Sequence, residues 1–279
     1  EVIGERAGII NLGLEVVMLI GAVVGFVATV KSGNPLLGVI AAALAGALFN
    51  MIFAFLVISR HANQLDSGLA LMCCGVGLSA LIGVSCSGSR IEGLSEIRIP
   101  LFSDIPFFGR AFFQYDILVY LAIPTAVAVW WFLFRTRWGL SLRAVGENPI
   151  AAYAAGKNPH LLQYQALFIS GLLGGIAGAH LSLALAYTWA EWMTAGRGFF
   201  SVALVIFAKW HPLRAIAGAL LFGGAISLQL QMQARGVPVS SFILDMLPYV
   251  LSLAVVTIWS GARRSAVPGS LGRVFQGTE

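Results

Sequence analysis

Four polar side chains stand close together at the start of an otherwise apolar chain: Glu5, Arg6, Asn11 and Glu15. Ionisable groups in or beside long apolar segments are costly to bury, so they mark functional sites by default. On a helix, Asn11 and Glu15 are one turn apart and share a face. We therefore predict that this group lines a polar path and hydrogen-bonds the hydroxyls or base edge of a solute. The alternative is that Glu5 or Glu15 pairs with Arg6 and fixes the irregular start of a helix.

A series of aromatic residues follows the fifth long apolar segment. Tyr187, Trp189 and Trp192 precede Phe199 and Phe200, and we include these two phenylalanines in the predicted path because such rings stack on a planar ligand. An aromatic belt at the membrane interface explains the same residues without a ligand. Isolated polar residues in the apolar segments are expected to hydrogen-bond across helices; they are His180, Gln229, Gln231 and Asp245.

No motif for catalysis or metal binding is present. The chain has no GxxxxGK[ST] phosphate loop, no HExxH, no CxxC and no GxSxG. Its four histidines are scattered, and Cys73, Cys74 and Cys86 are expected to be reduced and packed. We predict no catalytic residue, no metal site and no cofactor bound by this chain. Any ATP hydrolysis, with its Mg, must then occur in a separate protein.

The composition indicates which elements position these residues. Of 279 residues, 58% are hydrophobic and 10% are charged, with a mean hydropathy of +0.87. Apolar segments of about 20 residues recur throughout, each long enough to span the hydrocarbon core as a helix. They lack the alternation typical of barrel strands. The chain is therefore predicted to be an all-α, polytopic integral membrane protein.

Eight apolar segments are candidate spans in a single domain covering residues 1–279. The sixth has only about eleven residues, too few to cross at 1.5 Å per residue, so we predict a half-helix broken at His211–Pro212. Such breaks line cavities. Because the first residue is Glu1, we also expect a further helix upstream. The segments are residues 9–30, 36–58, 66–86, 116–134, 161–189, 199–209, 215–233 and 241–259.

The basic residues favour one orientation. With the loop 135–160 in the cytoplasm, eleven lysines and arginines fall inside and six outside, in the sense of the positive-inside rule. The tail 260–279 then also lies in the cytoplasm, and the protein is a multi-pass protein of the inner (plasma) membrane. The net charge of +5 is spread over short loops, which argues against nucleic acid as a partner.

Two local patterns predict helix contacts and helix ends. Three pairs of glycines spaced four residues apart allow helices to approach closely. In the loop 135–160, Asn148 can cap a helix, Pro149 suits its first turn and Gly156 suits a left-handed end. A helix so short is marginal alone in water, so it should dock against a neighbour or its own bundle. The glycine pairs are Gly21 with Gly25, Gly171 with Gly175, and Gly174 with Gly178.

Three stretches resemble the permease subunits of ATP-binding cassette (ABC) importers, in the branch for branched-chain amino acids, simple sugars and nucleosides. They are residues 139–156 (GLSLRAVGENPIAAYAAG), 4–22, and 196–213 followed by GALLFGG. The nucleoside-type subset is the most similar, although Val16 stands where that subset has glycine. The resemblance implies a coupling loop whose short helix fits a groove of the ATPase. The coupling residues implied are Arg143, Gly146, Glu147, Asn148, Pro149, Ala151, Ala152, Ala155 and Gly156.

The resemblance also implies partners: ABC ATPase subunits, a second permease subunit and an extracytoplasmic substrate-binding protein. The function predicted is a permease that forms the path for nucleosides or related small polar solutes. Branched-chain amino acids or simple sugars are alternatives, because Asn11 and Glu15 do not distinguish among solutes. In other classes, an energy-independent carrier leaves the capped helix unexplained. An intramembrane enzyme would need two facing groups from Glu15, Asp245 and His180, and no spacing predicts them.

Overall fold

The computed structural model describes residues 1–98, 114–236 and 267–273, with six single positions between 240 and 257. Most of these residues are helical, and one two-stranded antiparallel sheet joins β1 (Ile97–Arg98) to β2 (Gln114–Tyr115). The helices are α1 (Val2–Arg6), α2 (Leu14–Ser32), α3 (Pro35–Ala54), α4 (Gln64–Gly83), α6 (Ile117–Arg135), α7 (Arg137–Glu147), α8 (Pro149–Ala154), α9 (Pro159–His180), α10 (Arg197–Phe207) and α11 (Pro212–Ala234). Short π turns, η1 (Phe55–Ser59) and η3 (Leu181–Leu185), extend α3 and α9, and a 3₁₀ turn, η2 (Val84–Cys86), extends α4.

Six of the described helices are long and apolar enough to cross a membrane: α2, α3, α4, α6, α9 and α11. They confirm six of the predicted segments. The sixth predicted segment is α10, which has 11 residues and is as short as expected. Its break from α11 uses Lys209 and Trp210 in the left-handed region, with φ of 52° and 55°. The eighth predicted segment, 241–259, lies outside the continuously described residues.

Helix starts follow the local sequence. Asn34, Asn63 and Asp116 each accept a backbone N–H of the first turn of α3, α4 and α6 respectively, as expected of capping residues. Proline occupies the first position of α3, α8, α9 and α11, where its missing N–H costs no helical hydrogen bond. These signals set the first residue of α3, α4, α6, α9 and α11.

Helices α2, α3 and α9 form the tightly packed centre of the molecule. At their crossings the glycines face backbone: a Cβ on Gly21 would lie 2.4 Å from the Gly175 carbonyl oxygen, and one on Gly175 would lie 2.1 Å from that of Ala42. A Cβ on Gly178 would similarly meet the Met18 carbonyl. The predicted close approach at the glycine pairs is therefore confirmed. Backbone contact of this kind drives packing between apolar helices in a membrane.

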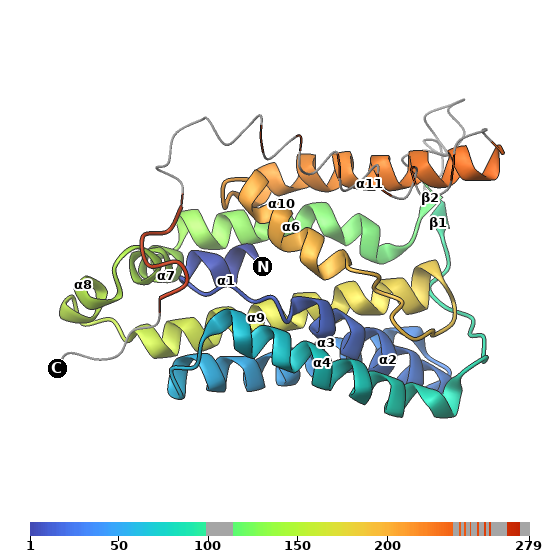
Figure 1. The fold of residues 1–279 in the computed structure, drawn as a ribbon, viewed down its shortest axis with the longest axis horizontal. Coiled ribbons are helices and arrows are strands. Elements are labelled where there is room, and N and C mark those ends of the chain that lie inside the picture. The colour runs from blue at the N-terminus through green and yellow to red at the C-terminus, as the bar shows by residue number, and fades with distance from the viewer. Residues whose placement is uncertain are drawn as a thin grey trace.

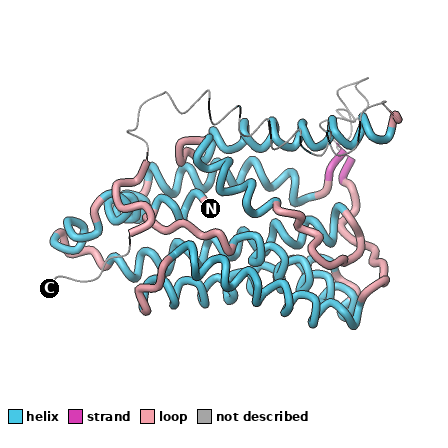
Figure 2. The backbone as a smooth tube through the Cα atoms, viewed as in Figure 1, coloured by secondary structure: helices cyan, strands magenta, loops and turns pink. Residues whose placement is uncertain are grey.

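Helices α6 and α11 run together beside this centre, and α1 and α10 lie between the two groups (Figure 1). In α6 only Leu133 is buried, so most of this helix faces outward. The loops gather at the ends of the bundle (Figure 2). Helices α7 and α8 and the described tail lie at one end, and β1 and β2 lie at the other (Figure 1).

Candidate functional site

Glu15, in the first turn of α2, holds the start of α10. Its side chain is 1% exposed. One carboxylate oxygen accepts hydrogen bonds from the Thr194 hydroxyl and the Gly196 N–H (2.8 Å), and the other accepts the Gly198 N–H. A carboxylate at a helix N-terminus satisfies free N–H groups and interacts favourably with the helix dipole. Glycine is needed at position 198, because a Cβ there would lie 2.4 Å from the Glu15 Cα.

Asn11 lies before α2 rather than on it. Its side-chain oxygen accepts the Gly13 N–H (2.8 Å), a turn contact that competes with helix formation, and α2 starts only at Leu14. The expectation that Asn11 shares a helix face with Glu15 is therefore wrong. The Asn11 amide donates to Asn50 Oδ1 (2.7 Å), and Asn50 donates to the Leu167 carbonyl (2.6 Å). Asn11 thus connects the segment before α2 to α3 and α9.

Glu5 and Arg6, on α1, hold the break between α10 and α11. The Trp210 indole N–H donates to Glu5 Oε2 (2.7 Å), and Arg6 Nε donates to the Trp210 carbonyl (2.9 Å). Burial, with a smaller contribution from the Glu1 carboxyl, raises the pKa of Glu5 to about 8. Within the described part of the chain, neither Glu5 nor Glu15 forms an ion pair with Arg6. The two residues therefore position the left-handed turn at Trp210.

Most of the predicted path residues are thus engaged within the chain. Glu5, Asn11 and Glu15 are each 1% exposed. Phe199 and Phe200 are half-buried on α10, and the Phe200 ring lies 6.1 Å from that of Phe222 on α11. Contact of these residues with a solute stays a prediction.

The aromatic residues before α10 do not form one stacking face. Trp189 is buried, and its ring covers Gly83. The Tyr187 hydroxyl donates to the Leu94 carbonyl, whereas Trp192 is 42% exposed. These three side chains therefore have separate surroundings.

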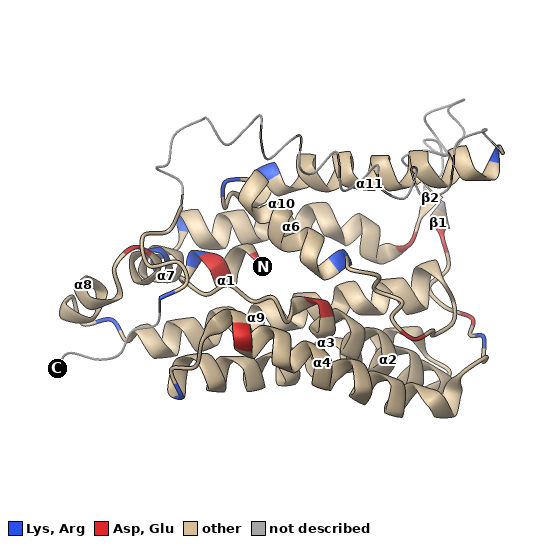
Figure 3. Ribbon diagram, in the orientation of Figure 1, with Lys and Arg blue, Asp and Glu red and all other residues tan. Residues whose placement is uncertain are grey.

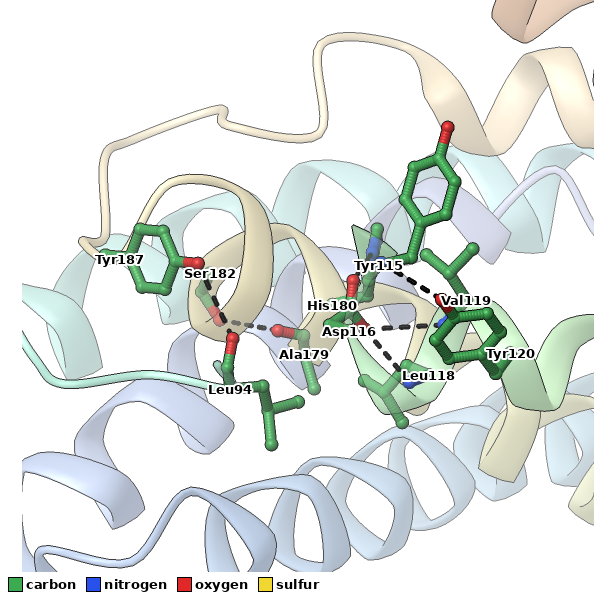
Figure 4. Close-up of polar contacts among 10 residues, drawn as sticks. All are labelled: Leu94, Tyr115, Asp116, Leu118, Val119, Tyr120, Ala179, His180, Ser182 and Tyr187. Carbon is green, nitrogen blue, oxygen red and sulfur yellow. Dashed lines mark hydrogen bonds and ion pairs between the residues drawn. The ribbon is translucent and has the colours of Figure 1, made fainter. Parts of the chain in front are cut away.

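A polar contact joins α6 to α9 at the end opposite α8. His180 Nε2 lies 3.2 Å from Asp116 Oδ2, while Asp116 Oδ1 accepts the N–H groups of Leu118 and Val119 at the start of α6 (Figure 4). His180 therefore bonds a partner on another helix, as expected for isolated polar residues. Asp245, which was also expected to hydrogen-bond across helices, lies outside the described residues.

The loop 135–160 contains two helices, and the second has the predicted ends. The Asn148 side chain accepts the Ala151 N–H (3.0 Å), Pro149 begins α8, and Gly156 has φ of +76°. Ile150 and Tyr153 are 58% and 50% exposed, whereas Ala152 is 5% exposed. The helix α8 therefore rests on the bundle through Ala152 and presents an outward face formed by Ile150, Ala151, Tyr153 and Ala154. Ala155 and Gly156 continue this exposed surface.

The other predicted coupling residues attach α7 to the bundle. Arg143 Nε donates to the Leu133 carbonyl (3.1 Å), and its guanidinium lies 4.7 Å from the centroid of the Phe134 ring. Gly146 packs on α1, where a Cβ would lie 2.1 Å from the Arg6 carbonyl oxygen. Arg143 and Gly146 therefore link α7 to α6 and α1 and do not belong to the outward face of α8.

A turn in the described tail is hydrogen-bonded to the end of α7 and to the segment that follows α1. The Ser270 N–H donates to the Gly146 carbonyl (2.9 Å), and the Gly272 N–H donates to the Gly8 carbonyl (3.0 Å). The Gly269 N–H donates to Glu147 Oε2 (3.1 Å). The described tail therefore lies at the end of the bundle that carries α7.

Sequence reasoning missed the partners of the predicted residues. Thr194, Trp210, Asn50 and Ser270 lie far along the chain from the groups they bond, and no spacing pairs them. The basic residues cluster toward the α7 end, while several acidic residues lie between the helices (Figure 3). Among the described residues, no group of three His, Cys, Asp or Glu side chains could hold a metal ion.

Comparison with known proteins identifies the family. A putative glucose ABC transporter permease (TsgC13) of Haloferax volcanii is 38% identical over 97% of this chain and 90% of its own length. A nucleoside ABC transporter permease (NupC) of Lactococcus lactis is 37% identical, and a guanosine ABC transporter permease (NupQ) of Bacillus subtilis is 34% identical, each over 93% of this chain and 86% of its own length. No solved structure matches. The family described as the permease component of branched-chain amino acid transport systems matches residues 2–258 of this chain. The chain therefore belongs to this family of ABC transporter permeases.

Proposed function

We propose that this chain is one of two permease subunits of an ATP-driven importer for nucleosides or related small polar solutes. The observation that supports the proposal most directly is the outward face of α8. A continuous series of contacts connects the helix next to it, α7, to α10. Gly146 of α7 packs on Arg6, Arg6 bonds the Trp210 carbonyl, and Trp210 follows α10. The far end of α10 is held by Glu15.

In the proposed mechanism, two ATPase subunits bind α8 and close around ATP and Mg. Because α7 is attached to α1 and α6, a displacement of α8 reaches the end of α10 through Arg6, while Glu15 holds the start of α10 on α2. The bundle then changes between inward-open and outward-open states. The α7 end faces the cytoplasm, and an extracytoplasmic binding protein delivers the solute at the end that carries β1 and β2.

Replacing the exposed residues of α8 tests the coupling site. In the double variant Ile150→Asp/Tyr153→Asp, we expect co-purification of the ATPase to fall at least about tenfold, because buried aromatic and aliphatic anchors dominate the energy of such interfaces. The measurement is a pull-down of the detergent-solubilised complex from its native membrane. Ala152 is not suitable for this test, because its burial means that a charge there disrupts the fold.

The matched control is Ile97→Asp, an exposed apolar residue of β1 at the opposite end. It should leave co-purification unchanged. Undiminished ATPase binding by the double variant contradicts the docking site on α8.

The solute is tested by competition. Phe199 and Phe200 are proposed to face the solute on α10. Glu5, Arg6 and Glu15 support that helix, and Asn11 holds the adjoining segment on α3 and α9. We expect uptake of labelled guanosine to be blocked by excess unlabelled nucleoside and to be little affected by glucose or leucine. Accumulation of labelled glucose instead would favour the sugar alternative, which the Haloferax relative's name suggests.

A further inference from the structure

A groove lies between α3, α6, α7 and α9, toward the end of the bundle that carries α8. It has a volume of about 420 Å³, and Met51, Phe132, Trp138, Tyr164, Gln165 and Phe168 line it. None of its lining residues belongs to the predicted solute path or to the outward face of α8. The groove is therefore separate from both parts of the proposed function.

The lining changes from polar to apolar along the groove. Near α7, the Trp138 indole N–H donates to Gln165 Oε1 (2.7 Å), and the Tyr164 and Ser59 hydroxyls are hydrogen-bonded (2.6 Å). Met51 lies eight residues before Ser59, which places it about 12 Å further into the bilayer at 1.5 Å per residue. The groove is thus polar at one end and apolar further along, within one leaflet.

Two arginines are next in the sequence to residues of the polar end. Arg60 follows Ser59 and Arg137 precedes Trp138 in the sequence, and both arginines are exposed. The ring of His61, which follows Arg60, lies 6.2 Å from that of His160. In the sequence, no Asp or Glu occurs within four positions of these four residues. The next carboxylate after His61 is Asp66, on α4, a helix that does not line the groove.

We propose that this groove binds an anionic phospholipid of the adjoining leaflet. Its phosphate lies at Arg60 and Arg137, and one acyl chain lies along the aromatic wall formed by Phe132, Tyr164 and Phe168. Basic pockets between membrane helices recognise such head groups, and each arginine near the surface contributes to the attraction. The proposed function enters this inference in one respect: the proposed membrane orientation makes the leaflet beside the groove the cytoplasmic one.

The chemistry distinguishes a lipid from other occupants. A free phosphate satisfies the arginines and leaves the aromatic wall without a ligand. A polar solute has few partners along Met51 and Phe168. Leu161 and Trp131, on the helices that border the groove, are 56% and 57% exposed, as expected for side chains that face hydrocarbon. A molecule with a charged head and an apolar chain matches both ends.

Native mass spectrometry of the full-length permease, purified with its ATPase and stripped of lipid, tests the proposal. The protein is incubated with equal amounts of phosphatidylglycerol and phosphatidylcholine that carry identical acyl chains. We expect preferential retention of phosphatidylglycerol, and a loss of about fivefold for each of Arg60→Gln and Arg137→Gln. The control is Arg235→Gln, which replaces the residue that follows α11, away from the groove. This variant should retain both lipids as the parent protein does. Equal retention of the two lipids, or no effect of the arginine variants, overturns the proposal.

A photo-crosslinking amino acid at Phe168 identifies the occupant in the membrane. We expect a lipid adduct; an adduct to a second copy of this chain or to another polypeptide overturns the proposal. The arginine variants should retain the ATPase, whereas Ile150→Asp/Tyr153→Asp should lose the ATPase and keep the lipid. Failure of the lipid site and failure of the proposed coupling are therefore distinguishable.

Discussion

Replacing Gly175 with leucine is expected to abolish accumulation of the folded permease. Gly175 lies where α9 crosses both α2 and α3, and a Cβ there would be 2.1 Å from the Ala42 carbonyl oxygen. Backbone cannot move aside as a flexible side chain can. Even Gly175→Ala forces the helices apart, at a cost of about 1–3 kcal/mol, and a leucine adds three further carbons. Fluorescence-detected gel filtration and the thermal midpoint of the solubilised protein measure the effect.

The matched control is Gly223→Leu. Gly223 lies within the span of α11, and no atom of the described residues stands within 4 Å of a Cβ added there. Among the described residues it therefore meets no obstacle, and its replacement by leucine should leave the elution profile and the thermal midpoint close to those of the parent protein. If both substitutions are tolerated equally, the crossing of α2, α3 and α9 is not as close as described.

Replacing Glu15 with alanine is expected to lower the maximal rate of uptake at least about tenfold. The Thr194 hydroxyl and the N–H groups of Gly196 and Gly198 lose their acceptor, and each unsatisfied buried donor costs about 1–3 kcal/mol. The start of α10 is then no longer held on α2. Glu15→Gln keeps one acceptor oxygen but directs an NH₂ group at donors, so it should be intermediate. Uptake of labelled nucleoside in membrane vesicles measures these rates.

The control is Glu191→Ala, which removes an exposed carboxylate from the loop before α10. Its uptake should be unchanged. A positioning role for Glu15 predicts a lower thermal midpoint and a lower maximal rate with the same apparent KM. A raised KM with normal stability would instead indicate direct contact between Glu15 and the solute.

The spans and helix ends were largely predictable because they depend on local sequence. Apolar length locates the long helices, and Asn148, Pro149 and Gly156 mark the ends of α8 by cap, fixed φ and left-handed conformation. The start of α2 was not predictable from hydropathy. Residues 9–13 are as apolar as those that follow, but the Asn11 side chain bonds the Gly13 N–H and delays the helix.

The site was predictable in its residue types and not in its pairings. The cost of burying Glu5, Arg6 and Glu15 marks them as important, and each is engaged in the structure. Their partners come from the other half of the chain, so the contacts depend on how α10 folds back between the helix groups. The division of the loop 135–160 into an outward face on α8 and an attachment at Arg143 likewise depends on tertiary burial.

The bond between the Gly272 N–H and the Gly8 carbonyl joins two residues that lie 264 positions apart in the sequence (272 minus 8). Contacts at such sequence separation form only after the intervening chain has been ordered. During synthesis, residue 272 emerges from the ribosome after the six described spans. The end of the bundle that carries α7 and α8, where we propose that the ATPase binds, is therefore completed only after those six spans have been made.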